Sequence, residues 1–201
     1  MARSIEENTA RLEEAVRERT EQLERLAHAD PLTGVFNRRG FERAFAKSRG
    51  RAGRTGHQAG LLLVDLDNLK PLNDRHGHQS GDAVIAELAH RMTTLLRDRD
   101  ICARWGGDEF ILLLDHVDRD DLSAIAAGIV AAAAERPVTL DSGVPVSVST
   151  SIGATLLEPE DTLNEAASRA DEALYVAKRN GRNGFAVSPP EELPLRRRSS
   201  G

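Results

Sequence analysis

Acidic side chains follow two apolar stretches of this 201-residue chain. Asp108 and Glu109 come directly after a Gly-Gly pair inside the segment ICARWGGDEFILLL, and Asp65 comes directly after the apolar run LLLV. A buried carboxylate is costly unless a positive charge lies beside it, so these acids predict a bound cation. Oxygen ligands of this kind suit Mg²⁺, which takes only one or two protein carboxylates and is carried in by substrate phosphates.

Each acid also has an ordinary interpretation when it is considered alone. A lone acid at a strand end is typical of a turn, and a Gly-Gly hairpin can carry solvated acids at its tip. Two acidic sites on two buried strands favour a ligand site. Asp65 and Asp67 would share one face of the strand if it continues that far. The pair His76 and His78 has no third ligand at zinc spacing, so it is read as part of a loop.

The segment NLKPLNDRHGHQSGD, residues 68–82, lies between these acids and is too polar for a core. Asn73 and Asp82 are of the type that can read guanine, because an amide accepts and donates while a carboxylate accepts from N–H groups. Lys70 is suited to meet a phosphate. A plain loop rich in Asn and Asp is the alternative for the same residues.

The elements that must position these residues alternate between helix and strand, which predicts an α/β or α+β fold. The segments 50–58 and 68–81 are expected as loops, and 101–114 as a hairpin. Helices are expected near 37–49, 82–96, 122–135 and 163–179, and strands near 60–67, 144–149, 151–157 and 184–187.

The overall composition excludes several classes of protein. The chain is 40% hydrophobic and 29% charged, as globular domains are, and its net charge of −5 argues against nonspecific binding of nucleic acid polymers. No run approaches the roughly 18 apolar residues of a membrane-spanning helix, and the charged N-terminus lacks an apolar signal core. A cytoplasmic location without a membrane segment is therefore expected. The single cysteine, Cys102, is read as a small buried apolar residue.

Both ends of the chain differ from its middle. Residues 1–29 are expected to form a signalling helix that pairs two chains as a coiled coil, or an amphipathic helix folded back on its own domain. Pro31 would end this helix. The tail 188–201 is expected to be disordered, with an electrostatic docking tail as the alternative. The heptad-like stripe consists of Ile5, Leu12, Val16, Leu23 and Leu26.

The segment RWGGDEF, residues 104–110, resembles the signature of the GGDEF family, the diguanylate cyclases. Three further segments resemble motifs of that family at matching offsets: DPLTGVFNRRGF (30–41), VDLDNLKPLNDRHGHQSGD (64–82) and ADEALYVAKRNGRN (170–183). The resemblance implies a catalytic domain over residues 30–187. Its fold would be a central, mostly antiparallel five-stranded sheet flanked by helices, similar to nucleotide cyclases and polymerase palm domains.

The resemblance also implies an activity, the condensation of two GTP molecules into cyclic di-GMP and two pyrophosphates by a homodimer. Mg²⁺, with Mn²⁺ as an alternative, would be held by Asp65, the carbonyl of Leu66 and Asp108. Asp108 is favoured as the proton acceptor, and Glu109 would support a second metal. The residues implied to contact the nucleotide are Asn73, His78, Asp82, Lys70, Lys178 and Arg182.

Arg97 and Asp100 have the spacing RxxD ahead of the Gly-Gly pair, which in this family marks an inhibitory site for the product. Arginine suits that site because its planar fork pairs with phosphate and stacks on guanine. A solvated charge run at a helix end is the alternative. Two departures from the family pattern are Leu69, where an aromatic residue is frequent, and Pro71, which follows Lys70.

Three other functions are alternatives to this enzyme. A catalytically inactive GGDEF domain would act as a receptor for cyclic di-GMP or GTP, but it would be expected to lose Asp65, Asp108 or Glu109, and all three are present. An enzyme that makes a mixed guanine-adenine dinucleotide is disfavoured by Asp82, because adenine has no N1–H. A structural coiled-coil adaptor would leave most of the chain unexplained. The upstream sensor and its signal are not readable from these residues.

Overall fold

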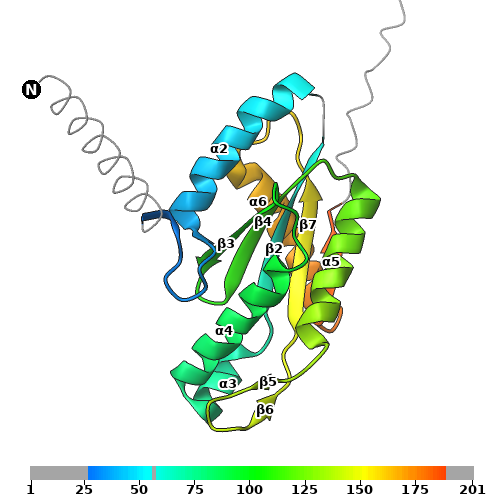
Figure 1. Cartoon of the computed structure of the whole chain (residues 1–201). Helices are drawn as coiled ribbons and strands as arrows, with labels where there is room; N and C mark the ends of the chain where they lie inside the picture. The colour runs from blue at the N-terminus through cyan, green and yellow to red at the C-terminus, as the bar shows by residue number, and fades with distance from the viewer. Residues whose placement is uncertain (1–26, 56–57, 189–201) are drawn as a thin grey trace, which may run out of the picture.

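A six-stranded sheet in the order β1-β3-β4-β2-β7-β8 runs through the computed structural model (Figure 1), which describes residues 27–55 and 58–188. The three central strand pairings are antiparallel and the two outer pairings are parallel. This arrangement confirms the mostly antiparallel sheet, to which the two-residue β1 adds a sixth strand. The strands are β1 (Phe36–Asn37), β2 (Ala59–Leu66), β3 (Ile101–Gly106), β4 (Glu109–Asp115), β7 (Thr150–Leu156) and β8 (Gly184–Val187).

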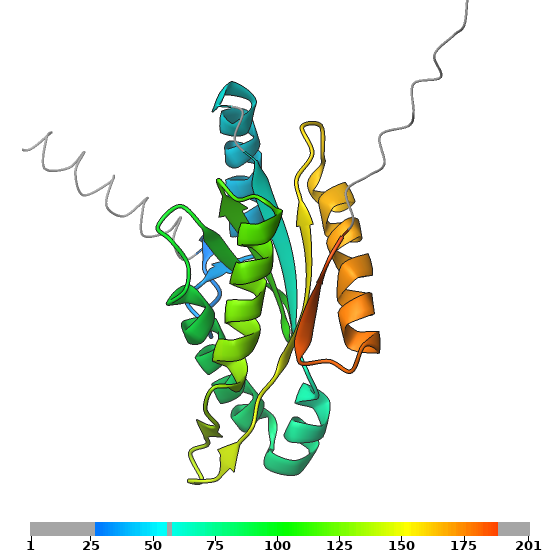
Figure 2. The same cartoon turned by 90° about the vertical axis from the view of Figure 1, so that its right-hand side faces the viewer.

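Helices cover both faces of this sheet, so the fold is a mixed α/β sandwich of three layers. Figure 2 shows the sheet edge-on, with α5 on one side and α6 on the other. The short strands β5 (Val138–Thr139) and β6 (Pro145–Val146) pair separately. The helices are α2 (Arg38–Thr55), α3 (Leu69–His76), α4 (His78–Thr93), α5 (Arg119–Ala134) and α6 (Leu163–Arg179).

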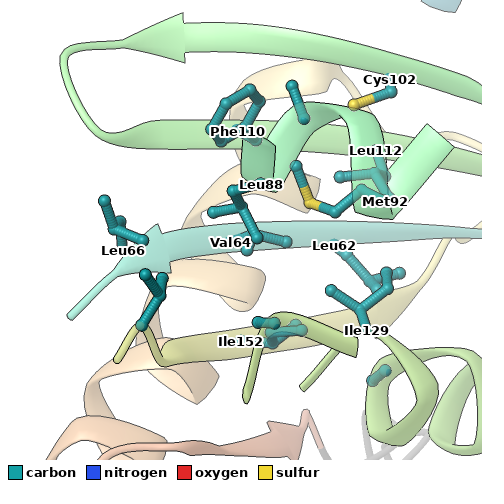
Figure 3. Packing of buried hydrophobic residues seen from close by; sticks show 14 of the residues in the cluster. Leu62, Val64, Leu66, Leu88, Met92, Cys102, Phe110, Leu112, Ile129 and Ile152 are labelled. Carbon is teal, nitrogen blue, oxygen red and sulfur yellow. The ribbon is translucent and has the colours of Figure 1, made fainter. Parts of the chain in front are cut away.

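The apolar run of β2 is continuous because both of its faces are buried. Leu62 and Val64 point into the layer formed with α4 and α5, where Figure 3 shows them beside Leu88 and Ile129. The alternate residues of β2 pack in the opposite layer against α2 and α6. Cys102 is also buried, as predicted, and burial raises the pKa of its thiol to about 12. The acids at the strand ends are thus carried by the most buried part of the fold.

The prediction of a loop at residues 68–81 was wrong, because this segment forms α3 and the first turn of α4. Leu69 is buried and Leu72 is partly buried, which gives α3 one apolar face among its polar residues. Pro71 lies in the first turn of α3, where a helix does not need its N–H group. Gly77, with φ +85°, separates the two helices.

Helix α6 lies unusually close to the sheet at Gly153 of β7. A Cβ atom at this position would overlap the carbonyl oxygen of Ala170 and the amide nitrogen of Leu174. Only glycine allows this approach of helix backbone to strand backbone. The contact fixes the distance between α6, which carries Lys178, and the central strands.

The predicted coiled-coil stripe at residues 5–26 and nearly all of the predicted tail, from residue 189, lie outside the described residues. Within the two ranges that the structure covers, no helix has both the length and the hydropathy needed to cross a membrane.

Candidate functional site

Strands β2 and β4 bring the predicted metal acids to one end of the sheet. Asp65 is paired in register with Glu109, and the amide nitrogen of Leu66 donates to the carbonyl oxygen of Asp108 at 3.2 Å. Gly107 has φ +50° in the turn between β3 and β4, a conformation that glycine adopts without strain. Residues separated by about forty positions in sequence therefore form one acidic group, consisting of Asp65, Asp108 and Glu109.

The positive charge beside these acids comes from α6. The Nζ atom of Lys178 lies 2.8 Å from Oδ2 of Asp65, whose side chain is only 14% exposed. The family resemblance implies that Lys178 meets a phosphate, and the structure adds this ion pair with Asp65. One lysine faces three carboxylates, so the acidic group keeps an excess of negative charge.

Two members of the acidic group, Asp65 and Glu109, have raised pKa values. Burial raises the pKa of Asp65, and the hydrogen bond and charge of Lys178 oppose this rise only in part. Burial also raises the pKa of Glu109, with further contributions from the charges of Asp65 and Asp108. A cation that binds here relieves the repulsion among these groups.

The donors fit a hard divalent cation that brings other ligands with it. Asp65, Asp108 and the carbonyl of Leu66 offer oxygen atoms, which Mg²⁺ and Mn²⁺ prefer. Over residues 27–55 and 58–188, no three His, Cys, Asp or Glu side chains already converge as a metal site. Two carboxylates with a carbonyl still suit Mg²⁺, because this ion keeps waters and takes phosphate oxygens.

Replacing Glu109 by Gln should raise the melting temperature of the ligand-free protein by about 2 °C at pH 7, a small gain because the Glu109 side chain is exposed and its repulsion from the other acids is partly screened. The folded state holds the Glu109 proton more tightly than the unfolded chain, so the charged form destabilises the fold at neutral pH. The free energy of unfolding of the wild type should therefore rise as the pH falls from 7 toward the ordinary carboxyl range. Calorimetry from pH 7 to 5 measures this rise in the free energy of unfolding, which should be smaller for Glu109→Gln than for the wild type.

The matched control for this prediction is Glu172→Gln, at an exposed position of α6. The control should have the melting temperature of the wild type within about 1 °C at pH 7, because an exposed charge outside the acidic group contributes little. A lower melting temperature for Glu109→Gln than for this control would contradict the assigned repulsion.

The residues predicted to read a base come together where α3 meets α4. The Oδ1 atom of Asn73 is buried and has no hydrogen-bond partner, which is costly unless a ligand supplies a donor. A Cβ atom at Gly81 would overlap the Asn73 amide, so glycine gives this side chain its place beside Asp82. His78 and Asp82 are both exposed on the first turns of α4.

The two remaining cationic residues of the predicted site are exposed. Lys70 lies on the first turn of α3. Arg182 follows α6, in a turn where it adopts φ +60°. Both side chains can meet a polyanion without losing a buried contact. The predicted site thus has an acidic group on the strands, an amide group on α3 and α4, and cations around them.

Arg97 and Asp100 lie at the opposite end of β3 from the acidic group, about 20 Å away for a strand of this length. They line a common cavity of about 520 Å³, together with Phe36 and Leu96. The carboxylate of Asp100 accepts from the amide nitrogens of Arg97 at 2.9 Å and of Asp115 at 3.2 Å. These bonds hold Asp100 in place, while the guanidinium of Arg97 is exposed.

A larger cavity, of about 650 Å³, lies between α3 and the segment 144–149. Neither Lys70 nor Asn73 is among its lining residues. Its most buried polar group, Asp67, already accepts three hydrogen bonds within the protein. The acidic group and the unpartnered Asn73 amide therefore mark the functional site better than cavity size does.

Sequence reasoning missed one residue that shapes the hairpin tip. The Nε atom of Arg104 donates to the carbonyl oxygen of Gly107 at 2.9 Å, and its Nη1 atom lies 3.5 Å from Oδ2 of Asp30. Arg104 thus ties the turn that carries Asp108 to the turn at residues 30–34. The sequence signal was present in the motif RWGGDEF, where Arg104 precedes the glycines.

Comparison of sequences identifies related proteins over most of the chain. Residues 27–184 match the family described as diguanylate cyclase, GGDEF domain. The diguanylate cyclase DgcM of Escherichia coli is 37% identical over 163 residues, which are 81% of this chain and 39% of that protein. An uncharacterised Bacillus subtilis protein, YhcK, is 38% identical over 83% of this chain and 47% of its own length. The chain spans less than half of each relative.

Solved structures support the same relationship. The coiled coil and GGDEF domain of DgcB from Caulobacter crescentus, solved in complex with c-di-GMP, matches with a TM-score of 0.83 at 28% identity. This match covers 91% of the present chain and 96% of that one. The GGDEF domain of TpbB from Pseudomonas aeruginosa matches with a TM-score of 0.76 at 36% identity, over 81% and 95% of the two chains.

Proposed function

Because the chain belongs to the GGDEF family of diguanylate cyclase domains, we propose that it condenses two GTP molecules into cyclic di-GMP and two pyrophosphates. The observation that carries this proposal is the acidic group at the ends of β2 and β4, with Lys178 at 2.8 Å from Asp65. Phosphoryl transfer requires charge neutralisation and in-line positioning more than covalent help. Carboxylates, lysines and an arginine around one end of the sheet are suited to both.

The guanine base is assigned to α3 and α4. The unpartnered Oδ1 atom of Asn73 would accept a hydrogen bond from the base, and Asp82 would accept from its ring and exocyclic N–H groups. His78, at the start of α4, would lie beside the nucleotide. Lys70, Lys178 and Arg182 would bind the triphosphate as cations.

The acidic group is assigned to the divalent metal and the reacting hydroxyl. Asp65, the carbonyl of Leu66 and Asp108 would hold Mg²⁺ or Mn²⁺, and Glu109 would support a second ion. When bound, the metal neutralises phosphate charge and lowers the pKa of the attacking 3′-hydroxyl. Asp108 would accept the proton of that hydroxyl. A metal ion bound to Asp65 would take over the charge balance that Lys178 now provides, so that Lys178 could turn to the triphosphate.

One chain supplies only half of the reaction site. Each GTP attacks the α-phosphate of the other, so two chains must bring their acidic groups face to face in a homodimer. Residues 1–29 would pair the two chains as a coiled coil, although residues 1–26 lie outside the described part. The similarity to a solved coiled-coil and GGDEF chain supports this assignment.

The central experiment is incubation of the protein with GTP and Mg²⁺, with the products separated by mass. Formation of cyclic di-GMP and pyrophosphate supports the enzyme. Tight binding of cyclic di-GMP without turnover would instead support the second candidate, an inactive receptor. That candidate is favoured by the cavity at Arg97 and Asp100 and by a relative solved with c-di-GMP. The three retained acids favour the enzyme.

We expect the product to inhibit the enzyme by binding in the cavity at Arg97 and Asp100. Replacing Arg97 by Ala removes a guanidinium that pairs with phosphate. The concentration of cyclic di-GMP that halves the rate should therefore rise at least about tenfold. The initial rate without product should stay unchanged, because this cavity is at the far end of β3. Initial rates measured with added cyclic di-GMP check both expectations.

The control is Arg99→Ala, which removes an exposed guanidinium two residues away that is not part of the cavity lining. Equal relief of inhibition in both variants would show that charge in the turn, and not the cavity, binds the product.

Replacing Gly81 by Ala should weaken GTP binding by about tenfold, because the new methyl group displaces the Asn73 amide that would read guanine. The KM for GTP reports this loss. Gly128→Ala in α5 is a matched control, since its added Cβ meets nothing within 4 Å. The control should leave the KM unchanged and stabilise its helix by about 0.5–1 kcal/mol. An unchanged KM for Gly81→Ala would contradict the role of Asn73.

A further inference from the structure

Asp67 is a buried carboxylate to which the proposed function gives no task. It directly follows β2, two residues after Asp65 and one after Leu66, and it is 8% exposed. Its amide nitrogen donates to the carbonyl oxygen of Ser149 at 2.9 Å, which extends the pairing of β2 with the β7 side by one residue. A buried acid in this place requires donors around it.

The carboxylate of Asp67 receives hydrogen bonds from two separate segments of the chain. The hydroxyl groups of Ser149 and Ser151 donate to Oδ2 at 2.8 Å and to Oδ1 at 2.7 Å. The amide nitrogen of Asn183 donates to Oδ2 at 3.1 Å. Oδ2 thus accepts two bonds and Oδ1 accepts one. These three bonds satisfy most of the acceptor capacity of the buried carboxylate and give it a fixed orientation.

The segment that Asp67 holds has an unusual backbone. Arg182 has φ +60° and Asn183 has φ +46°, and they follow Gly181 at φ +109°. Two neighbouring residues with a Cβ atom in the left-handed region persist only when their surroundings hold them there. The bond from Asn183 to Asp67 is one restraint. Another is the bond from the Arg182 amide nitrogen to the carbonyl oxygen of Ala177 at 3.3 Å.

Asp67 therefore connects two parts of the proposed site. On its N-terminal side are Asp65 and Leu66, which are assigned to the metal. On the far side of its carboxylate is Asn183, whose neighbour Arg182 is assigned to the triphosphate. The side chains of Ser149 and Ser151 hold the carboxylate on the sheet, so a movement of the turn would break the bond from Asn183 to Asp67.

We propose that Asp67 is a positioning residue, which sets the place of Arg182 relative to the metal ligands by clamping the turn at 181–183 to the end of β2. This inference rests on the proposed function only for the consequence on GTP. The clamp itself is a property of the folded chain and can be measured without any nucleotide.

The test is the Asp67→Asn variant, which keeps the shape of the side chain but replaces one acceptor oxygen by a donor group. The Asn183 amide then keeps at best a neutral acceptor, since the side-chain oxygen of Asn can take the place of Oδ2 while its NH2 group donates to the Ser151 hydroxyl. Its hydrogen exchange should become about fivefold to tenfold faster, because a bond to a neutral oxygen is weaker than one to a carboxylate and exchange follows local opening. The KM for GTP should rise by about tenfold, as expected when a charged phosphate contact is misplaced. The kcat should change much less.

Two comparisons separate positioning from general damage. In an Arg182→Ala background, Asp67→Asn should raise the KM by less than about twofold, because the two changes remove the same contact. Asp141→Asn, at an exposed position between β5 and β6, should leave both the exchange of Asn183 and the KM unchanged. Equal effects of Asp67→Asn with and without Arg182 would overturn the proposal.

The wild-type protein offers a measurement that does not depend on whether the variant folds. The Asn183 amide lies in an exposed turn, yet the clamp predicts that it exchanges as slowly as the amides that pair β7 with β8. Exchange at the rate of an open loop would overturn the clamp. If the wild type made no cyclic di-GMP while Asn183 was protected, the proposed function would fail and the clamp would stand.

Discussion

The Asp108→Asn variant should form cyclic di-GMP at least about 10³-fold more slowly than the wild type, because the change removes the charge of a proposed metal ligand and the proposed proton acceptor together. The fold should survive, since Asp108 lies in a turn and its carbonyl bond to the Leu66 amide is kept. The measurement is the initial rate of cyclic di-GMP formation, with product separated by chromatography.

Asp141→Asn is the control for loss of an acidic charge elsewhere on the surface, and it should retain the full rate. The melting temperature of Asp108→Asn should not fall below that of the wild type, because one of three crowded carboxylates has gone. A rate above about a tenth of the wild-type rate would remove Asp108 from both roles.

Mixing this variant with the wild type should inhibit the wild type. If two chains must each supply a working half, a chain paired with Asp108→Asn makes no product. With random pairing, a fourfold excess of the variant should lower the turnover of a fixed amount of wild type to about one fifth. The rate of cyclic di-GMP formation, followed after the chains have exchanged partners, measures this effect.

The control adds the same excess of Asp108→Asn that also lacks residues 1–28. If the N-terminal helix pairs the chains, this shortened variant should leave the wild-type rate nearly unchanged. Inhibition by both versions would place pairing in the catalytic domain itself. Absence of inhibition by the full-length variant would contradict a site shared between two chains.

The gathering of the acidic group at the ends of two strands could be predicted from the sequence because its signals are local. Asp65 ends an apolar run, and Asp108 follows a Gly-Gly pair between two apolar runs, so both mark the end of a buried strand. The exact bounds of α6 and β8 were also predicted, since α6 has a regular apolar stripe and a capping box at Thr162. The helical nature of 68–81 was missed because its polar residues, Pro71 and Gly77 hide a short amphipathic pattern.

The contacts that complete the site could not be predicted, because they join distant segments through tertiary packing. Asp67 and Asn183 are 116 residues apart. The neighbouring sequence of Asp67 indicates only a second acid on the same face of the strand as Asp65. The ion pair of Lys178 with Asp65 depends on how closely α6 approaches the sheet. The unpartnered amide of Asn73 depends on the angle between two helices that the sequence did not suggest.

Gly153 is the point of closest contact between the sheet and α6, the helix that carries Lys178. Lys178 is one helical turn beyond Leu174, about 6 Å along the axis, so a side chain at position 153 would swing Lys178 away from Asp65. In each half-site the acids lie on β2 and β4 and the lysine lies on α6, which packs closely on the same sheet. The distance between the lysine and the acids is therefore set by this packing. If two chains share the reaction as proposed, regulation would act on how the two half-sites meet more than on the shape of either one.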